Sequence, residues 1–233
     1  MTLAALTSLR DIWRQGRFEV RRRLRRPVEG RFQPYPHTAP DRYPWLFDFA
    51  QSALEGMRAP AILSFGCSRG DEVFSLRRRF PDARIKGVDI DPANIAACLA
   101  RSRPLEDDRL SFEAAAHTRA EPSSHYEAIF CLAVLCHGDL TVTGARRSDP
   151  LLRFEDFERT VADLTRCLKP GGLLFLHTTN FRFSDTDVAA GFDTMLEATP
   201  EQMAPDVLFD RQGRLMPGER YYPVGFRKRA PPE

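Results

Sequence analysis

The sequence predicts an α/β protein with a doubly wound, mostly parallel sheet of seven strands, an antiparallel C-terminal hairpin and an N-terminal helical extension. From residue 46 onward, short apolar runs alternate with helical patterns of ten or more residues, as expected when right-handed helical crossovers join parallel strands. The runs at 129–135 and 173–176 are apolar without interruption, which is typical of strands covered on both faces. After Asn180 this alternation stops, and a turn at Gln212 and Gly213 indicates the hairpin.

The individual elements follow from this alternation and from local helix and turn signals. Strands are expected at 61–67, 84–90, 109–115, 126–135 and 172–180, and the hairpin at 206–217 with a last strand at 220–229. Helices are expected at 46–56, 70–80, 91–102 and 154–168. Asp91 is suited to cap its helix, since Pro92 follows it at the first helical position.

We expect the chain to have two parts. Residues 1–45 form a basic helical leader with an aromatic lid, and residues 46–233 form the α/β domain. Nine arginines and three acidic residues stand within 1–31, whereas the whole chain has a net charge of only +2. The spacing favours a helix packed by its apolar stripe with the arginines in solvent. The alternative is a basic helix that docks on anionic lipid or nucleic acid. Four prolines between residues 34 and 44 then exclude a regular helix, so we expect an ordered loop or lid.

The composition also predicts a cytoplasmic location. No apolar stretch approaches the roughly 20 residues that span a bilayer, and the N-terminus lacks the features of a secretion signal. The five cysteines are odd in number and form no C-x-x-C pair, which indicates neither a disulfide framework nor a zinc site. The five histidines are scattered, so we expect no metal.

The segment "FGCSRG" lies where the first strand becomes a helix, the place at which a doubly wound sheet binds its ligand. Gly66 and Gly70 allow a sharp turn and a close approach of the backbone to a ligand. The G-x-G-x-x-G pattern of dinucleotide sites and the ending of a phosphate-binding P-loop are both missing. Asp89, about twenty residues beyond the loop, can accept both hydroxyls of a ribose. The pattern therefore predicts an adenosine site without a pyrophosphate requirement.

Four motifs resemble those of class I S-adenosylmethionine-dependent methyltransferases, in the order and at the spacing of that family. They are "ILSFGCSRGDEVFSL", "GVDIDPANI", "YEAIFCLAVLCHG" and "LTRCLKPGGLLFLHTTN". The resemblance covers residues 46–180, and the glycine loop is most similar to the G-C-S-x-G variant of chemotaxis-receptor methyltransferases. It implies a Rossmann-like fold and S-adenosylmethionine as the cofactor.

The resemblance also implies a set of cofactor-binding residues. The glycine loop would line the methionine end of the cofactor, Asp89 would bind its ribose, and positions at later strand ends would contact the adenine and the sulfonium. The implied residues are Gly66, Cys67, Ser68, Gly70, Asp89, Ile90, Ala116, Cys131 and Leu132. From the lid, Arg42 and Tyr43 are candidates for the cofactor carboxylate. Two acids usual in the family are replaced, one by Ser64 and one by the alanines after the third strand.

Two histidines are candidate general bases, because a base is needed when the acceptor is a hydroxyl or a protonated amine. His137 is the first choice and His177 the second, and both follow or end predicted strands. The alternative for each is a hydrogen-bonded structural histidine. Tyr221 and Tyr222 are candidates to wall the acceptor pocket, and Arg69 to bind an anionic substrate.

Three functions remain open. The favoured one is methyl transfer to an oxygen or nitrogen of a small molecule or sugar, because the short lid and the hairpin leave no separate recognition domain. The second is a methyltransferase that acts on RNA or protein and uses the arginine-rich leader as a docking arm, so nucleic acid is the less favoured partner. The third is a non-catalytic module that binds the cofactor.

Overall fold

The computed structural model describes residues 30–35, 38–149, 151–204 and 207–230. The chain divides into two units, Met1–Arg31 and Phe32–Glu233. The predicted basic leader lies almost entirely outside the described residues. The larger unit holds the strands and helices described below.

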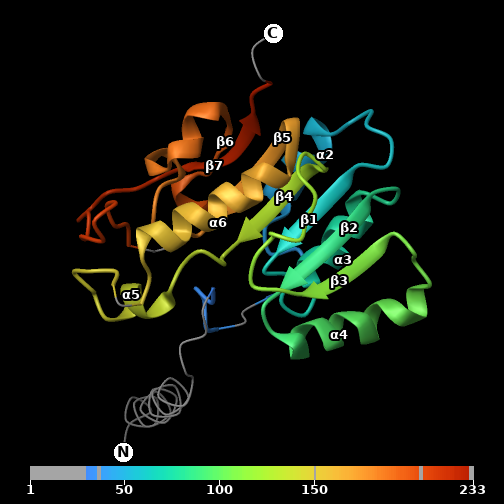
Figure 1. Cartoon of the computed structure of the whole chain (residues 1–233), viewed down its shortest axis with the longest axis horizontal. Helices are drawn as coiled ribbons and strands as arrows, with labels where there is room; N and C mark the ends of the chain where they lie inside the picture. Colours follow the sequence, from blue (N-terminus) through green and yellow to red (C-terminus); the bar gives the residue numbers. More distant parts are fainter. Residues whose placement is uncertain (1–29, 36–37, 150, 205–206, 231–233) are drawn as a thin grey trace, which may run out of the picture. The chain divides into compact units, whose positions relative to one another are not determined.

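The larger unit is built on one seven-stranded sheet with the order β3-β2-β1-β4-β5-β7-β6 (Figure 1). The strands are β1 (Ala61–Phe65), β2 (Arg84–Asp89), β3 (Leu110–Ala114), β4 (Tyr126–Leu132), β5 (Leu168–His177), β6 (Phe192–Glu197) and β7 (Pro223–Lys228). The first five strands pair in parallel, and β7 pairs antiparallel with both β5 and β6. The predicted seven-stranded, mostly parallel sheet with antiparallel C-terminal strands is therefore confirmed, whereas the predicted N-terminal helical extension lies outside the described residues.

Helices cover both faces of this sheet. They are α2 (Pro44–Ala53), α3 (Asp71–Arg79), α4 (Pro92–Ser102), α5 (Gly138–Val142) and α6 (Phe154–Cys167), with short 3₁₀ turns at Arg103–Leu105, Phe183–Asp185, Asp187–Gly191 and Pro200–Gln202. As predicted, the Asp91 side chain caps α4 by accepting from the N–H of Ala93. Pro44 begins α2 instead of belonging to the irregular segment, because the first turn of a helix does not use the missing N–H.

Two hydrophobic cores explain why the central strands are apolar without interruption. Leu173 and Phe175 of β5 pack with side chains of α2, α3 and α4, whereas Leu174 and Leu176 pack with side chains of α6. Successive side chains of a strand point to opposite faces, so a strand between two helical layers must be apolar at every position. Phe130 of β4 stacks on Phe175 with ring centroids 4.8 Å apart, which ties β4 to β5 within the first core.

The C-terminal hairpin differs from the prediction in its first strand. The last strand is β7, as expected, but its partner is β6 and not the segment before the turn at Gly213. That segment makes only an isolated bridge, between Phe209 and Leu215. β6 escaped detection because it is an edge strand in which only Phe192 is buried, so it carries no alternating apolar pattern. Among the helices that the structure describes, none has the length and apolarity needed to cross a bilayer.

Candidate active site

The glycine loop joins β1 to α3 through a tight turn. Gly66 and Gly70 have left-handed φ angles of 77° and 86°, which favour glycine. A Cβ at Gly66 would lie 2.3 Å from Cγ2 of Val134, and a Cβ at Gly70 would lie 2.9 Å from the ring of Phe74. Both glycines are therefore required by backbone conformation and by space. Val134, which follows β4, lies directly against the loop.

The hydroxyl of Ser68 is an orphaned polar atom in the middle of this loop. Its Oγ is buried and finds no hydrogen-bond partner among the residues that the structure describes. Buried polar atoms without partners are rare because desolvation costs about 1–3 kcal/mol. An unpaired hydroxyl in a glycine loop at the end of the first strand is the kind of atom that a bound ligand satisfies.

Asp89 lies beside the loop, as the sequence predicted. It ends β2 and is 7% exposed. Its Oδ2 accepts from the N–H of Ser68 at 2.8 Å, while Oδ1 accepts from the N–H of Asp91 at 2.9 Å and from Asn94 Nδ2 at 3.0 Å. An ionised carboxylate offers about four acceptor positions, so these three bonds leave one for a ligand.

Glu72 is a functional candidate that sequence reasoning missed. The hydroxyl of Ser64, which replaces the expected acid at the end of β1, donates to Oε1 of Glu72 at 2.7 Å. Burial raises the pKa of this carboxyl to about 7, although the Ser64 hydrogen bond and the positive charge of Arg42 oppose the shift. The acid missing from the strand is thus supplied by the first turn of α3. A glutamate two residues after Gly70 was the available sequence signal.

His177 is enclosed in a hydrogen-bonded and aromatic environment. It is 2% exposed, its Nε2 lies 3.0 Å from the carbonyl of Gln202, and its Nδ1 lies 2.8 Å from Oγ1 of Thr178. Because a carbonyl only accepts, Nε2 carries the proton and Nδ1 accepts from the Thr178 hydroxyl. The ring of Tyr43 packs against the imidazole with centroids 4.7 Å apart. Burial lowers the pKa of His177 to about 4, so the imidazole is neutral at pH 7 with both nitrogens in use.

His137 is half-buried at the N-terminus of α5, after β4. Its Nδ1 accepts from the N–H of Asp139 at 3.3 Å, a long bond, and its own N–H donates to Oδ1 of Asn180 at 2.7 Å. Asp139 is buried and accepts from the hydroxyl of Tyr35 at 3.1 Å. His137 therefore caps α5 and lies at the carboxyl edge of the sheet.

Asn180 organises the loops around His137 and was not singled out from the sequence. It is fully buried, accepts from the N–H of His137, and donates through Nδ2 to the carbonyl of Val207 at 2.8 Å. One side chain thereby links the loop after β4, the loop after β5 and the segment that precedes β7. The only sequence signal was its position after the fifth strand.

Three of the seven described non-glycine residues that have a positive φ lie at this edge of the sheet. Ser68, Ala133 and Thr178 have left-handed φ angles of 50°, 58° and 59°, and they follow β1, β4 and β5. The N–H of Ala133 donates to the carbonyl of His177 at 2.8 Å, which joins two of these turns. Such conformations cost on the order of 1–3 kcal/mol each, so the surrounding structure must hold them in place.

The remaining predicted residues differ in how deeply they are buried. Tyr43 is buried against His177, and burial raises the pKa of its hydroxyl. Ile90 and Ala116 are half-buried after β2 and β3. The thiol of Cys131 is fully buried in the core on the α6 side, so only its backbone can face a ligand. The other loop and strand-end residues, Cys67 and Leu132, are also buried.

One family model matches part of the chain. Residues 63–174 match the family described as "Methyltransferase domain". Among curated proteins none matches the chain significantly. Solved structures with similarity include the [4+2]-cyclase SpnF (18% identity, TM-score 0.44), geranyl diphosphate C-methyltransferase from Streptomyces coelicolor A3(2) (20%, 0.41) and coclaurine N-methyltransferase (16%, 0.42). Each match covers 57% of this chain but only 43%, 44% and 34% of those chains, so this chain spans less than half of their length.

Proposed function

We propose that this chain, whose residues 63–174 match a methyltransferase domain, transfers the methyl group of S-adenosylmethionine to an oxygen or nitrogen of a small molecule. The family match supports both the activity and the cofactor. The observation that carries the proposal is the convergence of three polar groups on the glycine loop: the Ser68 hydroxyl without a partner, the Asp89 carboxylate with one acceptor position left, and the Glu72 carboxyl.

These groups fit the parts of an adenosyl amino acid. Asp89 would accept from a ribose hydroxyl, and Ser68 would hydrogen-bond the ligand through its orphaned Oγ. Glu72 would face the α-ammonium group, because a carboxylate in a partly dry site attracts a cation strongly. Arg42 would bind the carboxylate, and its positive charge acts on Glu72 and on His177. Ile90 and the backbone at Ala116 would border the adenine, while Gly66, Cys67 and Gly70 give the backbone its close approach.

When bound, the cofactor supplies an electrophilic methyl carbon on a positively charged sulfur. The residues of this chain then have two tasks: to align the acceptor with that carbon and to keep water away. Val134 against Gly66 and buried Leu132 at the end of β4 supply apolar cover at this edge of the sheet.

The two histidines take different roles in this proposal. His137 is the general base, because its Nδ1 accepts a long bond of 3.3 Å from a backbone N–H and can exchange that bond for a proton of the acceptor. His177 is a positioning residue, because accepting a proton would break the bond from Thr178 and charge a buried ring. It holds Thr178 in its left-handed conformation at the end of β5 and fixes the Gln202 carbonyl.

A small-molecule acceptor is favoured over RNA or protein. Docking of a macromolecule would depend on the arginine-rich leader, which lies outside the described residues. A methyltransferase that docks on nucleic acid would lose affinity steeply with salt. Salt-independent turnover that survives deletion of residues 1–29 would support the small-molecule acceptor.

The experiment that tests the proposal is titration calorimetry with S-adenosylmethionine. Asp89→Ala should weaken binding by about 1–3 kcal/mol, or roughly 5- to 150-fold, because a ribose hydroxyl loses its acceptor. Asp82→Ala is the matched control, since Asp82 is an exposed aspartate in the turn before β2. No heat with the wild-type protein would refute the proposal. Equal affinities of wild type and Asp89→Ala would remove Asp89 from the site.

A further inference from the structure

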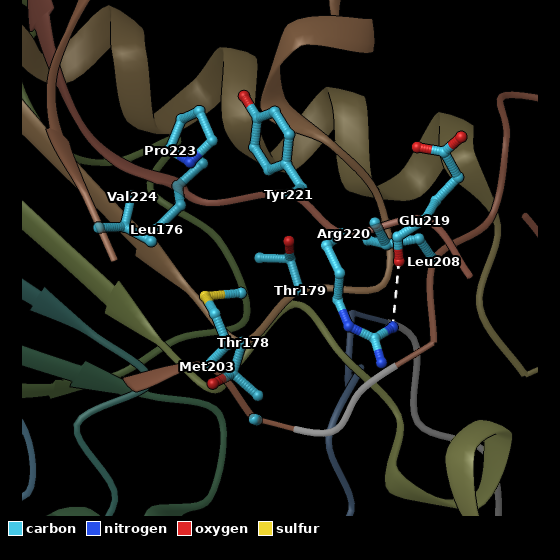
Figure 2. Close-up of a pocket in the computed structure, with 11 residues that line it drawn as sticks. Leu176, Thr178, Thr179, Met203, Leu208, Glu219, Arg220, Tyr221, Pro223 and Val224 are labelled. Atoms are coloured by element: carbon cyan, nitrogen blue, oxygen red, sulfur yellow. Dashed lines mark hydrogen bonds between the residues drawn. The ribbon is translucent and has the colours of Figure 1, made fainter. Parts of the chain in front are cut away.

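A hollow lies beside the carboxyl end of β5, on the side of β7 (Figure 2). The space among its lining residues is about 420 Å³, a volume that includes open solvent. Its walls come from β5 and the turn after it, from the segment around Met203, and from the residues that enter β7. The apolar side chains in these walls are Leu176, Met203, Leu208, Pro223 and Val224.

Most polar groups of this hollow are already engaged in hydrogen bonds. The hydroxyl of Thr179 donates to the carbonyl of Phe181 at 2.7 Å, and that of Thr178 donates to His177. Tyr221 accepts at its hydroxyl from the N–H of Ser184 at 3.2 Å. Each of these oxygens keeps an acceptor position, but none of them carries a charge. They shape the walls and add weak polarity.

Arg220 is the exception. Its guanidinium makes one hydrogen bond, from Nη1 to the carbonyl of Glu219 at 3.2 Å, and no carboxylate pairs with it among the residues that the structure describes. Figure 2 shows the guanidinium extending from the rim of the hollow while the carboxylate of Glu219 points the opposite way. A guanidinium offers five N–H donors in a planar fork that matches a carboxylate, sulfonate or phosphate. The hollow therefore combines apolar walls with one uncompensated positive charge.

The hollow also adjoins the strained edge of the sheet. Thr178, one of its wall residues, has the left-handed φ of 59° and follows His177, whose carbonyl accepts from Ala133 after β4. The same carboxyl edge carries the glycine loop after β1. A molecule seated in the hollow would thus approach the edge at which the cofactor is proposed to bind.

We propose that this hollow binds the methyl acceptor, and that the acceptor is a small, largely apolar molecule whose anionic group is held by Arg220. The identification of the bound molecule as a methyl acceptor rests on the proposed function. The acceptor oxygen or nitrogen gives its lone pair to the new bond with the methyl carbon, while the bond from that carbon to sulfur breaks with its electron pair left on sulfur. The proton of the acceptor passes to His137.

The test uses two fluorescent probes that differ in charge: 8-anilinonaphthalene-1-sulfonate and its uncharged parent, N-phenyl-1-naphthylamine. The full-length wild-type protein should bind both. Arg220→Gln should weaken binding of the sulfonate at least tenfold and leave the neutral probe unchanged. Ala204→Phe, which fills the hollow from a half-buried position in its wall, should weaken both. Arg84→Gln, an exposed arginine at the amino end of β2, is the control and should change neither.

Affinity for S-adenosylhomocysteine, measured on the same variants, separates the two proposals. We expect it to be unchanged by Arg220→Gln and Ala204→Phe, and unchanged when the sulfonate probe is bound. Equal sulfonate affinity in wild type and Arg220→Gln, absence of probe binding, or displacement of S-adenosylhomocysteine by the probe would overturn the acceptor site. The protein could instead bind the sulfonate through Arg220 but fail to bind S-adenosylhomocysteine. This result would show that the hollow binds anions and would refute the proposed methyltransferase function.

Discussion

The hydroxyl of Ser64 donates to the carboxyl of Glu72 at 2.7 Å, which joins the end of β1 to the first turn of α3 beneath the glycine loop. Burial holds this carboxyl at a pKa of about 7, so the site carries an acid that a nearby cation would ionise. Strand β1 contributes only a small hydroxyl, and the helix contributes the ionisable group. The stability of the protein and its affinity for the cofactor should both depend on this pair.

Glu72→Gln should change how stability depends on pH. In the folded protein the carboxyl stays protonated up to about pH 7, whereas in the unfolded chain it ionises near its ordinary value of 4.5. The free energy of unfolding contributed by this group is therefore fully present below pH 4.5 and falls as the pH rises to 7. The loss is on the order of 1–3 kcal/mol, and the glutamine variant should not show it.

Urea unfolding between pH 4.5 and 8 measures this effect. Glu155→Gln is the matched control, because Glu155 also stands in the first turn of a helix but is exposed. Parallel pH profiles for wild type and Glu72→Gln would contradict a raised pKa at Glu72.

Glu72 should also make cofactor affinity depend on pH. A cationic ammonium group binds the ionised carboxylate better than the protonated acid, so affinity for S-adenosylhomocysteine should rise between pH 5.5 and 7.5. Glu72→Gln should bind more weakly at pH 7.5 and show a flat profile. Calorimetry in buffers of different ionisation heat should also detect proton release from the wild type. An unchanged profile in the variant would place the ammonium group elsewhere.

Gly66→Ala should destabilise the protein far more than its backbone conformation alone requires. The added methyl would lie 2.3 Å from Val134, whereas the equivalent methyl at Gly56, which has a similar φ of 80°, would meet nothing within 4 Å. Gly56→Ala therefore measures the conformational cost, about 1–2 kcal/mol. The excess cost of Gly66→Ala should shrink in a double variant with Val134→Ala.

A double-mutant cycle on thermal unfolding gives this coupling energy directly. A coupling near zero would mean that the loop and Val134 are not in contact in solution. Coupling of more than about 1 kcal/mol would confirm that the loop after β4 packs on the glycine loop.

His177→Gln should make the protein more resistant to mild acid. Burial lowers the pKa of His177 to about 4, below its ordinary value of 6.5, so the unfolded chain takes up a proton before the folded one does. Stability from this group is therefore present above pH 6.5 and lost as the pH falls toward 4, by on the order of 1–3 kcal/mol. His125→Gln, at an exposed histidine, is the control. Equal losses of stability in wild type and His177→Gln over this range would contradict a lowered pKa.

The same variant tests the role of His177 in catalysis. Because we propose that His177 positions Thr178 and that His137 is the base, the His177→Gln variant should keep the pH profile of turnover of the wild type, with kcat lowered uniformly. His137→Gln should lower kcat and abolish the acidic limb of that profile while cofactor affinity is unchanged. If His177→Gln, and not His137→Gln, lost the acidic limb of the pH profile, then His177 would be the general base and His137 the positioning residue.

The central strands, and the placement of the glycine loop and Asp89 at strand ends, were predictable from the sequence because they depend on local patterns. Uninterrupted apolar runs reflect burial on both faces, and Gly66, Gly70 and Asp89 stand at the strand ends where a doubly wound sheet binds ligands. Strand β6 was not predictable, since an exposed edge strand has no apolar period. Glu72 and Asn180 were missed because their roles depend on which strand end each side chain meets, as in the bond between Asn180 and His137, 43 residues apart.

The most direct test of the proposed cofactor site is a crystal structure of the protein with S-adenosylhomocysteine. We expect one ribose hydroxyl to lie within hydrogen-bond distance of Asp89, the ammonium group to face Glu72, and the Ser68 hydroxyl to gain a partner. Density for the ligand away from the loop, or a Ser68 hydroxyl that is still without a partner beside the ligand, would contradict it.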